Sequence, residues 1–176
     1  NKSNIYINNC FNIALKILKN KKCSGLINGP ISKKNFLKNK FLGITEYLAN
    51  KENKNNNVAM LIYNKKLSVS PITTHLPLKE VHKNLSTKKI IKHIKIINNF
   101  YRNRFKKEPK IAVTGLNPHC ESNYKSSEEN NIISPAIKYL NKVKLKVDGP
   151  FAADTIFMSK QSKKYDVIVG MYHDQV

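Results

Sequence analysis

The sequence contains no tryptophan, only 6 glycines among its 176 residues, and no Cys-x-x-Cys pair. It has no Gly-x-Gly-x-x-Gly or Walker phosphate loop, which excludes the usual Rossmann fingerprint as the place where a dinucleotide binds. No apolar run approaches the roughly 20 residues that span a bilayer. No signal or transit peptide is recognisable. We therefore expect no membrane partner.

The three cysteines, Cys10, Cys23 and Cys120, form an odd set without the spacing of a metal site. Free thiols are typical of a reducing compartment, since disulfide frameworks use paired cysteines in oxidising ones. The sequence therefore predicts a cytoplasmic location. Cys120 lies beside His119 and could therefore be near a site. The simpler interpretation is that it is a small residue in a turn.

Acidic residues are also scarce: 11 oppose 32 basic ones, so the net charge is +21. Such a charge first suggests a nucleic-acid partner. However, only Arg102 and Arg104 are arginines, and base edges and phosphates are read best by arginine forks. Lysine, asparagine and isoleucine, which have A/T-rich codons, make up more than a third of the chain. Composition bias therefore explains the charge, and we expect no nucleic-acid partner.

Apolar residues recur at helical spacing or in short runs along the whole chain. Predicted helices cover 5–20, 33–38, 87–106, 128–141 and 152–160, and another opens at Gly43. Thr45 is the expected N-cap of the helix that opens at Gly43, and Ser86 is the expected N-cap of the helix 87–106. Predicted strands cover 23–28, 58–63, 67–72, 111–116 and 143–147, and a final strand follows Tyr165. The strands 58–63 and 67–72 are expected to pair as a hairpin, and Gly149-Pro150 is expected to end the strand 143–147. Because strands and helices alternate, the fold class is α/β with a mixed or mostly parallel sheet.

Three of the five histidines directly follow predicted strands: His75, His119 and His173. In open α/β sheets, ligands bind outside the carboxyl ends of the strands. Three imidazoles suit zinc or another divalent metal, and Asp154 and Asp174 are candidates to orient a ligand or transfer a proton. Spacings of 44 and 54 positions match no local metal motif, so the residues alone indicate only a possible three-histidine site.

The other two histidines, His82 and His93, lie in polar helical surroundings. His93 is outside the apolar stripe of Ile90, Ile94 and Ile97 in the predicted helix 87–106. We therefore predict that both are solvated surface residues rather than ligands.

Several short sequence strings carry information about the family that the spacing of the histidines does not. They are Gly29-Pro30-Ile31-Ser32-Lys33, Thr45-Glu46-Tyr47-Leu48-Ala49, Thr73-Thr74-His75-Leu76-Pro77-Leu78, Gly115-Leu116-Asn117-Pro118-His119, Gly149-Pro150 with Ala153-Asp154-Thr155, and Met171-Tyr172-His173-Asp174-Gln175. In this order they resemble the PdxA family, 4-hydroxythreonine-4-phosphate dehydrogenase of pyridoxal phosphate (vitamin B6) biosynthesis. The resemblance covers essentially the whole chain.

The resemblance implies a fold similar to isocitrate and isopropylmalate dehydrogenases, with mixed sheets flanked by helices and a cleft between two α/β domains. Residues 1–42 would belong to the first domain and residues 43–176 to most of the second. The chain does not start with Met and ends just after its richest polar cluster. We therefore expect a central fragment that lacks the family's N- and C-terminal segments.

The resemblance also implies an NAD- or NADP-dependent oxidation of 4-phosphooxy-L-threonine, a small phosphorylated hydroxy amino acid, followed by decarboxylation. His75, His119 and His173 fall on the family's ligands for a divalent cation, which could be Zn, Mg or Co. The family shares this site between the subunits of a homodimer. Thr45 falls on a substrate-binding position, while Asp154 and Asp174 are the candidate catalytic residues.

Some positions depart from the family pattern. Ile44 stands where the family has a substrate-contacting histidine, Ser32 replaces an asparagine, and Ala152 replaces a proline. The segment 120–127 contains no glycine, whereas the family has a glycine-rich loop there. These differences leave two alternatives open. One is a related dehydrogenase of a phosphorylated four-carbon sugar acid; the other is an inactive remnant or a basic binding protein.

Overall fold

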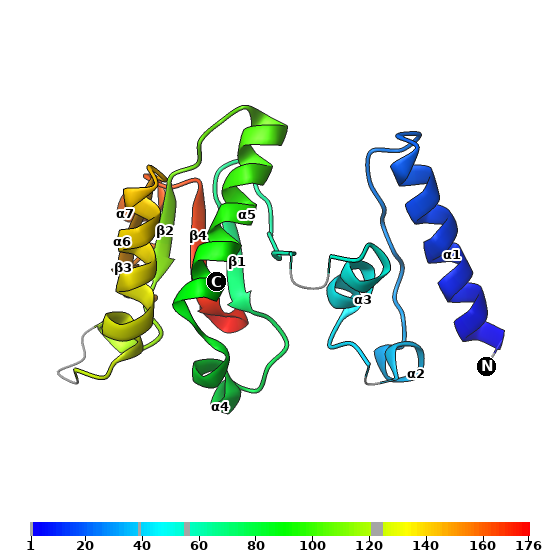
Figure 1. Ribbon diagram of the computed structural model, residues 1–176, viewed down its shortest axis with the longest axis horizontal. Helices are drawn as coiled ribbons and strands as arrows, with labels where there is room; N and C mark the ends of the chain where they lie inside the picture. Colours follow the sequence, from blue (N-terminus) through cyan, green and yellow to red (C-terminus); the bar gives the residue numbers. More distant parts are fainter. Residues whose placement is uncertain (1, 39, 55–56, 121–124) are drawn as a thin grey trace. The chain divides into compact units, whose positions relative to one another are not determined.

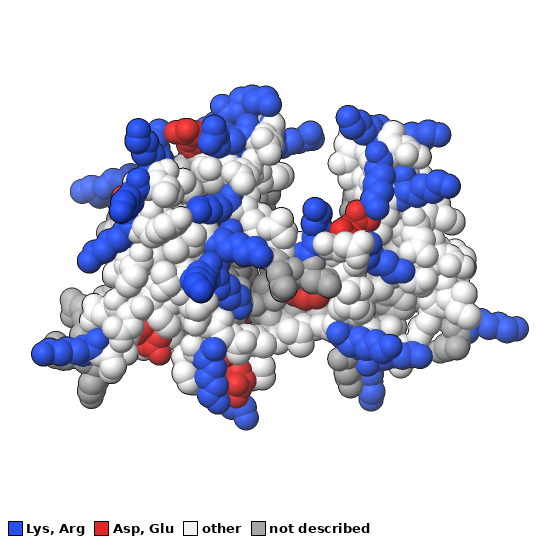
Figure 2. Space-filling model, viewed as in Figure 1, with Lys and Arg blue, Asp and Glu red and all other residues white. Residues whose placement is uncertain are grey.

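The computed structural model describes residues 2–38, 40–54, 57–120 and 125–176. The chain divides into two compact units, Asn1–Leu48 and Ala49–Val176 (Figure 1). No helix among the described residues is both long and apolar enough to cross a membrane. On the face shown in Figure 2, lysine and arginine side chains are spread over both units rather than gathered in one patch.

The first unit is built around an aromatic cluster. It contains α1 (Lys2–Lys19), α2 (Lys33–Leu37) and the start of α3 (Ile44–Lys51). Phe11 and Tyr47 are buried, and their rings meet edge to face at 5.3 Å between centroids. The two helices predicted near residues 5–20 and 33–38 are confirmed. The prediction that Thr45 caps α3 is wrong, because the helix already begins at Ile44.

The predicted strand at residues 23–28 is also wrong. Residues 23–30 form no strand and are exposed, and Ile27 is 99% exposed. An apolar run becomes a strand only where a neighbouring strand takes its backbone hydrogen bonds. The described residues of this unit include no strand that could do so.

The second unit contains a four-stranded sheet in the order β1-β4-β2-β3. Its strands are β1 (Ser68–Thr73), β2 (Ile111–Thr114), β3 (Val147–Phe151) and β4 (Val167–Tyr172). All neighbouring strands pair in parallel. The predicted α/β class with a mostly parallel sheet is therefore confirmed. Of the predicted hairpin between 58–63 and 67–72, the structure has one antiparallel bridge, Ile62 with Val69.

Helices cover the sheet as expected for parallel strands, which are buried on both faces. The longest are α5 (Thr87–Phe105) and α6 (Ser134–Lys142), which lie beside each other over one face (Figure 1). The short elements are α4 (Leu78–Val81), η1 (His82–Asn84), η2 (Pro118–Cys120), η3 (Glu129–Ile133), α7 (Ser159–Ser162) and η4 (His173–Gln175). Val113 and Val169 face α5 and α6, whereas Ala112 and Ile168 pack with Ile156 on the other face.

Two features of α5 follow directly from its sequence. Ser86 is the N-cap, and its side chain accepts a hydrogen bond from the backbone N–H of Lys89, as predicted. Ile90, Ile94 and Ile97 are 0–1% exposed and form the apolar stripe of the helix. Burying three such side chains stabilises the unit by roughly 5–9 kcal/mol.

The boundaries around β3 differ from the prediction. A strand was expected at 143–147, with Gly149-Pro150 breaking it, but β3 runs through both residues. Proline lacks an N–H and is tolerated in edge strands, and β3 lies at the edge of the sheet. Val143 instead closes the end of α6, where its N–H bonds to Tyr139 O. The helix predicted at 152–160 is a series of turns followed by the short α7.

His82 is exposed as predicted, but the prediction for His93 is wrong. His93 is 7% exposed, and its Nε2 lies 2.7 Å from Ser70 Oγ on β1. The Ser70 hydroxyl donates its own proton to Met60 O, so its oxygen can accept a hydrogen bond from Nε2–H. A partner on the sheet thus allows a neutral imidazole to be buried.

This burial predicts a pH-dependent stability. Burial, and secondarily the charge of Lys89, lowers the pKa of His93 to about 4. The imidazole of the unfolded chain titrates near 6.5. The contribution of neutral His93 to the free energy of unfolding is therefore complete above about pH 6.5, and roughly 3 kcal/mol of it is lost as the pH falls towards 4. Urea unfolding between pH 7.5 and 4 should show this slope, and His93→Gln should remove it. His82→Gln is the control, and equal slopes in all three proteins would disprove the assignment.

Candidate active site at the carboxyl edge of the sheet

The three histidines of interest lie at one edge of the sheet. β1 ends at Thr73, two residues before His75, and β4 ends at Tyr172, immediately before His173. His119 lies in η2, the turn that follows β2. Because β1, β4 and β2 are parallel neighbours, their carboxyl ends share the edge where α/β sheets bind ligands. All three histidines are exposed there.

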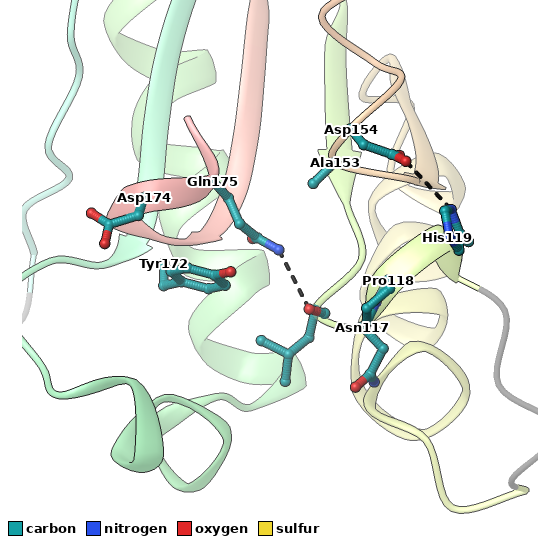
Figure 3. Close-up of a pocket in the computed structure, with 9 residues that line it drawn as sticks. Asn117, Pro118, His119, Ala153, Asp154, Tyr172, Asp174 and Gln175 are labelled. Carbon is teal, nitrogen blue, oxygen red and sulfur yellow. Dashed lines mark hydrogen bonds and ion pairs between the residues drawn. The ribbon is translucent and has the colours of Figure 1, made fainter.

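A cavity of about 390 Å³ opens at this edge (Figure 3). It is lined by Leu116, Asn117, Pro118, His119, Ala153, Asp154, Tyr172, Asp174 and Gln175. The structure therefore brings His119 together with both predicted catalytic candidates, Asp154 and Asp174. His75 and His173 are outside this lining set, and Thr45 lies on α3 in the first unit.

Two of the histidines have a carboxylate beside Nδ1. His119 Nδ1 lies 3.4 Å from Asp154 Oδ2, and His173 Nδ1 lies 3.0 Å from Asp174 Oδ1. A carboxylate at Nδ1 favours the tautomer that holds its proton there and leaves the Nε2 lone pair for another partner. This is the arrangement in which metal-binding histidines are commonly held. The donor chemistry therefore fits a divalent cation.

The described residues of one chain do not bring three metal ligands together. Over residues 2–38, 40–54, 57–120 and 125–176, no group of three His, Cys, Asp or Glu side chains is arranged to hold a metal ion. The three-histidine set from the sequence consequently stays a prediction.

The backbone that presents His119 is unusual. His119 and Cys120 are consecutive residues with φ values of 58° and 56°, in the left-handed region that non-glycine residues seldom occupy. Burial raises the pKa of the Cys120 thiol, so this cysteine resists forming a thiolate. The segment 120–127, which contains no glycine, continues from this turn. Its residues 121–124 lie outside the described part of the chain.

Glu129 holds the turn that presents His119. The sequence indicated only that this residue lies at the start of the predicted helix 128–141. Glu129 is 3% exposed, and its Oε1 accepts hydrogen bonds from the backbone N–H groups of Leu116 and Asn117, both at 2.8 Å. Its Oε2 accepts from Asn117 Nδ2 at 2.8 Å. Burial alone would raise the pKa of Glu129, but these hydrogen bonds outweigh it and hold the pKa below its ordinary value. The ionised carboxylate therefore anchors the turn that leads to His119.

We expect Glu129→Gln to destabilise the second unit by about 2–3 kcal/mol, because it turns a buried charged acceptor into a group with a donor facing other donors. That corresponds to a melting temperature lower by roughly 5–10 °C. Glu128→Gln is the matched control. Glu128 is half-buried and accepts a hydrogen bond from the Asn117 side chain, so this substitution should lower the melting temperature by about 1–2 °C at most. Equal losses in the two variants would contradict this role.

Ile44, at the position where the family pattern has histidine, has a structural role in this chain. It packs against the buried cluster of Phe11, Leu37 and Tyr47. An isoleucine there adds apolar contact but cannot hydrogen-bond a ligand. The neighbouring Thr45, half-buried on α3, keeps a hydroxyl.

Comparison with known proteins identifies a family whose sequence pattern this chain matches. The family model described as "Pyridoxal phosphate biosynthetic protein PdxA" matches residues 1–176. A 4-hydroxythreonine-4-phosphate dehydrogenase from Sulfurihydrogenibium sp. is 40% identical over 175 residues, which cover 97% of this chain and 52% of that protein. One from Wigglesworthia glossinidia brevipalpis is 44% identical over 161 residues, covering 89% and 48% respectively.

A solved structure is also similar. The crystal structure of 4-hydroxythreonine-4-phosphate dehydrogenase from Klebsiella pneumoniae superposes with a TM-score of 0.80 at 31% identity, covering 95% of this chain and 52% of that one. The parallel sheet flanked by helices is therefore shared with these dehydrogenases. The chain spans about half the length of the relatives that it matches.

Proposed function

We propose, because this chain belongs to the PdxA family, that it forms part of a dehydrogenase that oxidises 4-phosphooxy-L-threonine with NAD or NADP in pyridoxal phosphate biosynthesis. The observation that supports this most is the shared sheet edge. There, three strands present histidines, and carboxylates lie at Nδ1 of two of them. The names of the similar proteins supply the substrate.

The residues can be given roles in this reaction. His75, His119 and His173 would bind a divalent cation, with Asp154 and Asp174 fixing the tautomers of His119 and His173. When bound, a cation such as Zn, Mg or Co supplies Lewis-acid polarisation of a substrate oxygen. Asp154 and Asp174, which line the cavity, are the candidates to accept the proton of the substrate's hydroxyl group. Thr45 would bind substrate through its hydroxyl.

The ligand set favours a site shared between two subunits. Within the described part of one chain, three ligands do not converge, so we propose a homodimer in which each site receives ligands from both subunits. We further propose the isocitrate dehydrogenase-like arrangement of two domains around a cleft. In it, residues 1–42 belong to the first domain and residues 43–176 to most of the second.

A second candidate is a related dehydrogenase of a phosphorylated four-carbon sugar acid. The observation that favours it is Ile44, which packs into an apolar cluster and cannot replace a hydrogen-bonding histidine. Discrimination by a lost hydrogen bond can reach several orders of magnitude, so one substitution could change the preferred substrate.

The experiment is to measure NADH formation by the protein encoded by the complete reading frame, with both substrate types and a divalent cation. Faster turnover of 4-phosphooxy-L-threonine supports the proposal, whereas preference for the sugar acid supports the alternative. Ile44→His is the informative variant, since it should raise kcat/KM for 4-phosphooxy-L-threonine. No turnover of either substrate would favour an inactive remnant.

A further inference from the structure

β2 and β4 pair over only the first part of their length. Their paired positions end at Val113 with Val169, while β4 continues to pair with β1 as far as Thr73 with Tyr172. Beyond Val113 and Val169, the sheet is therefore split between β2 and β4. His119 follows the strand on one side of the split, and His173 follows the strand on the other.

The side chain of Gln175 bridges this split (Figure 3). Its Oε1 accepts hydrogen bonds from Met171 N on β4 at 2.7 Å and from Thr114 Oγ1 on β2 at 3.2 Å. Its Nε2 donates to Gly115 O at 2.9 Å, with Leu116 O at 3.4 Å. The amide thus takes the place of a peptide group between two strands that no longer pair.

The backbone is shaped to bring Gln175 into this position. η4 folds back along the end of β4, so that Gly170 lies under it. A Cβ at Gly170 would lie 2.6 Å from Val176 Cγ1 and 3.3 Å from Gln175 Cβ, closer than side-chain atoms normally approach. The absence of a side chain at Gly170 therefore allows the turn that aims the Gln175 amide at β2.

We infer that Gln175 is a positioning residue that sets the separation between the His119 turn and the His173 turn. It holds the β4 side through Met171 and the β2 side through Gly115, and it lines the cavity between them. Its effect on metal binding rests on the proposed function. The hydrogen bonds of Gln175 to β4 and to the end of β2, which we call the brace, are a property of this fold. Residues that orient metal ligands typically change affinity 10- to 100-fold when replaced.

The test uses Gln175→Met, which keeps the length of the side chain and removes its hydrogen bonds, with the exposed Gln161→Met as matched control. We expect the Met171 amide to exchange its hydrogen at least about tenfold faster in Gln175→Met. We expect the affinity for Co²⁺ to fall about 10- to 100-fold, with a changed visible absorption spectrum. Gln175→Glu should keep the acceptor for Met171 but lose the donor to Gly115.

The two readouts separate the outcomes. Unchanged Met171 exchange in Gln175→Met would overturn the brace, whatever the metal data show. Faster exchange together with unchanged Co²⁺ affinity would overturn the positioning role. Faster exchange in a protein whose unsubstituted form binds no divalent ion would support the brace and contradict the proposed metal function instead.

Discussion

Saturating Zn²⁺ is expected to raise the melting temperature of the protein, and His119→Ala is expected to abolish the rise. An ion present at 100 times its dissociation constant stabilises the folded state by about 2.7 kcal/mol, which corresponds to roughly 5–10 °C for a chain of this size. His119 is exposed at the sheet edge, so its removal should leave the metal-free protein nearly as stable as before. Thermal unfolding with and without Zn²⁺ measures both quantities.

His82→Ala is the matched control for this experiment. His82 is also exposed but lies in η1, away from a strand end, so the full Zn²⁺ effect should persist in this variant. Asp154→Asn should weaken the Zn²⁺ effect without abolishing it, since in the proposed site Asp154 contacts His119 Nδ1 rather than the ion. An undiminished rise in His119→Ala, or an equal loss in His82→Ala, would count against the site.

Gly149→Ala is expected to prevent stable folding of the second unit. Gly149 has φ +134°, which residues with a Cβ rarely adopt, and an added Cβ would collide with the carbonyl oxygen of Val113 on β2. Backbone atoms on a paired strand cannot move aside as a flexible side chain can. We expect a loss of about 3 kcal/mol or more, visible in urea unfolding or as insoluble protein.

Gly25→Ala provides the control, because nothing lies within 4 Å of a Cβ built at Gly25. That variant should unfold at the same urea concentration as the unsubstituted protein. Normal stability in Gly149→Ala would mean that β3 does not approach β2 as described. Since β3 leads directly to the turn bearing Asp154, such a result would also remove the physical basis for placing Asp154 beside His119.

The sequence predicted those parts of the fold that depend on local signals. The stripe of Ile90, Ile94 and Ile97, with Ser86 as the cap, defined α5 within a residue or two. β1, β2 and β4 were predicted because buried parallel strands appear as short apolar runs. The segment 23–28 has the same pattern but no described partner strand, and pairing is not encoded in a single run.

For the site, the sequence predicted only that the three histidines lie at the same edge of the sheet. Histidines after apolar runs reach one edge when the strands are parallel neighbours, which the alternation of strands and helices indicated. The burial of His93 depends on Ser70, which lies 23 positions away, and the anchoring by Glu129 depends on Leu116 and Asn117. Gln175 belonged to the polar cluster noted in the sequence, but its bridging role appears only where β2 and β4 part.

In the proposed site, His75, His119 and His173 together bind one divalent ion. The most direct measurement is a Co²⁺ titration, followed by visible absorption, of the unsubstituted protein and the three single alanine variants. We expect each variant to lose at least about 100-fold in affinity for Co²⁺, since an ion left with two imidazoles keeps too few protein ligands. Unchanged affinity and spectrum in any one of the three variants would contradict this site.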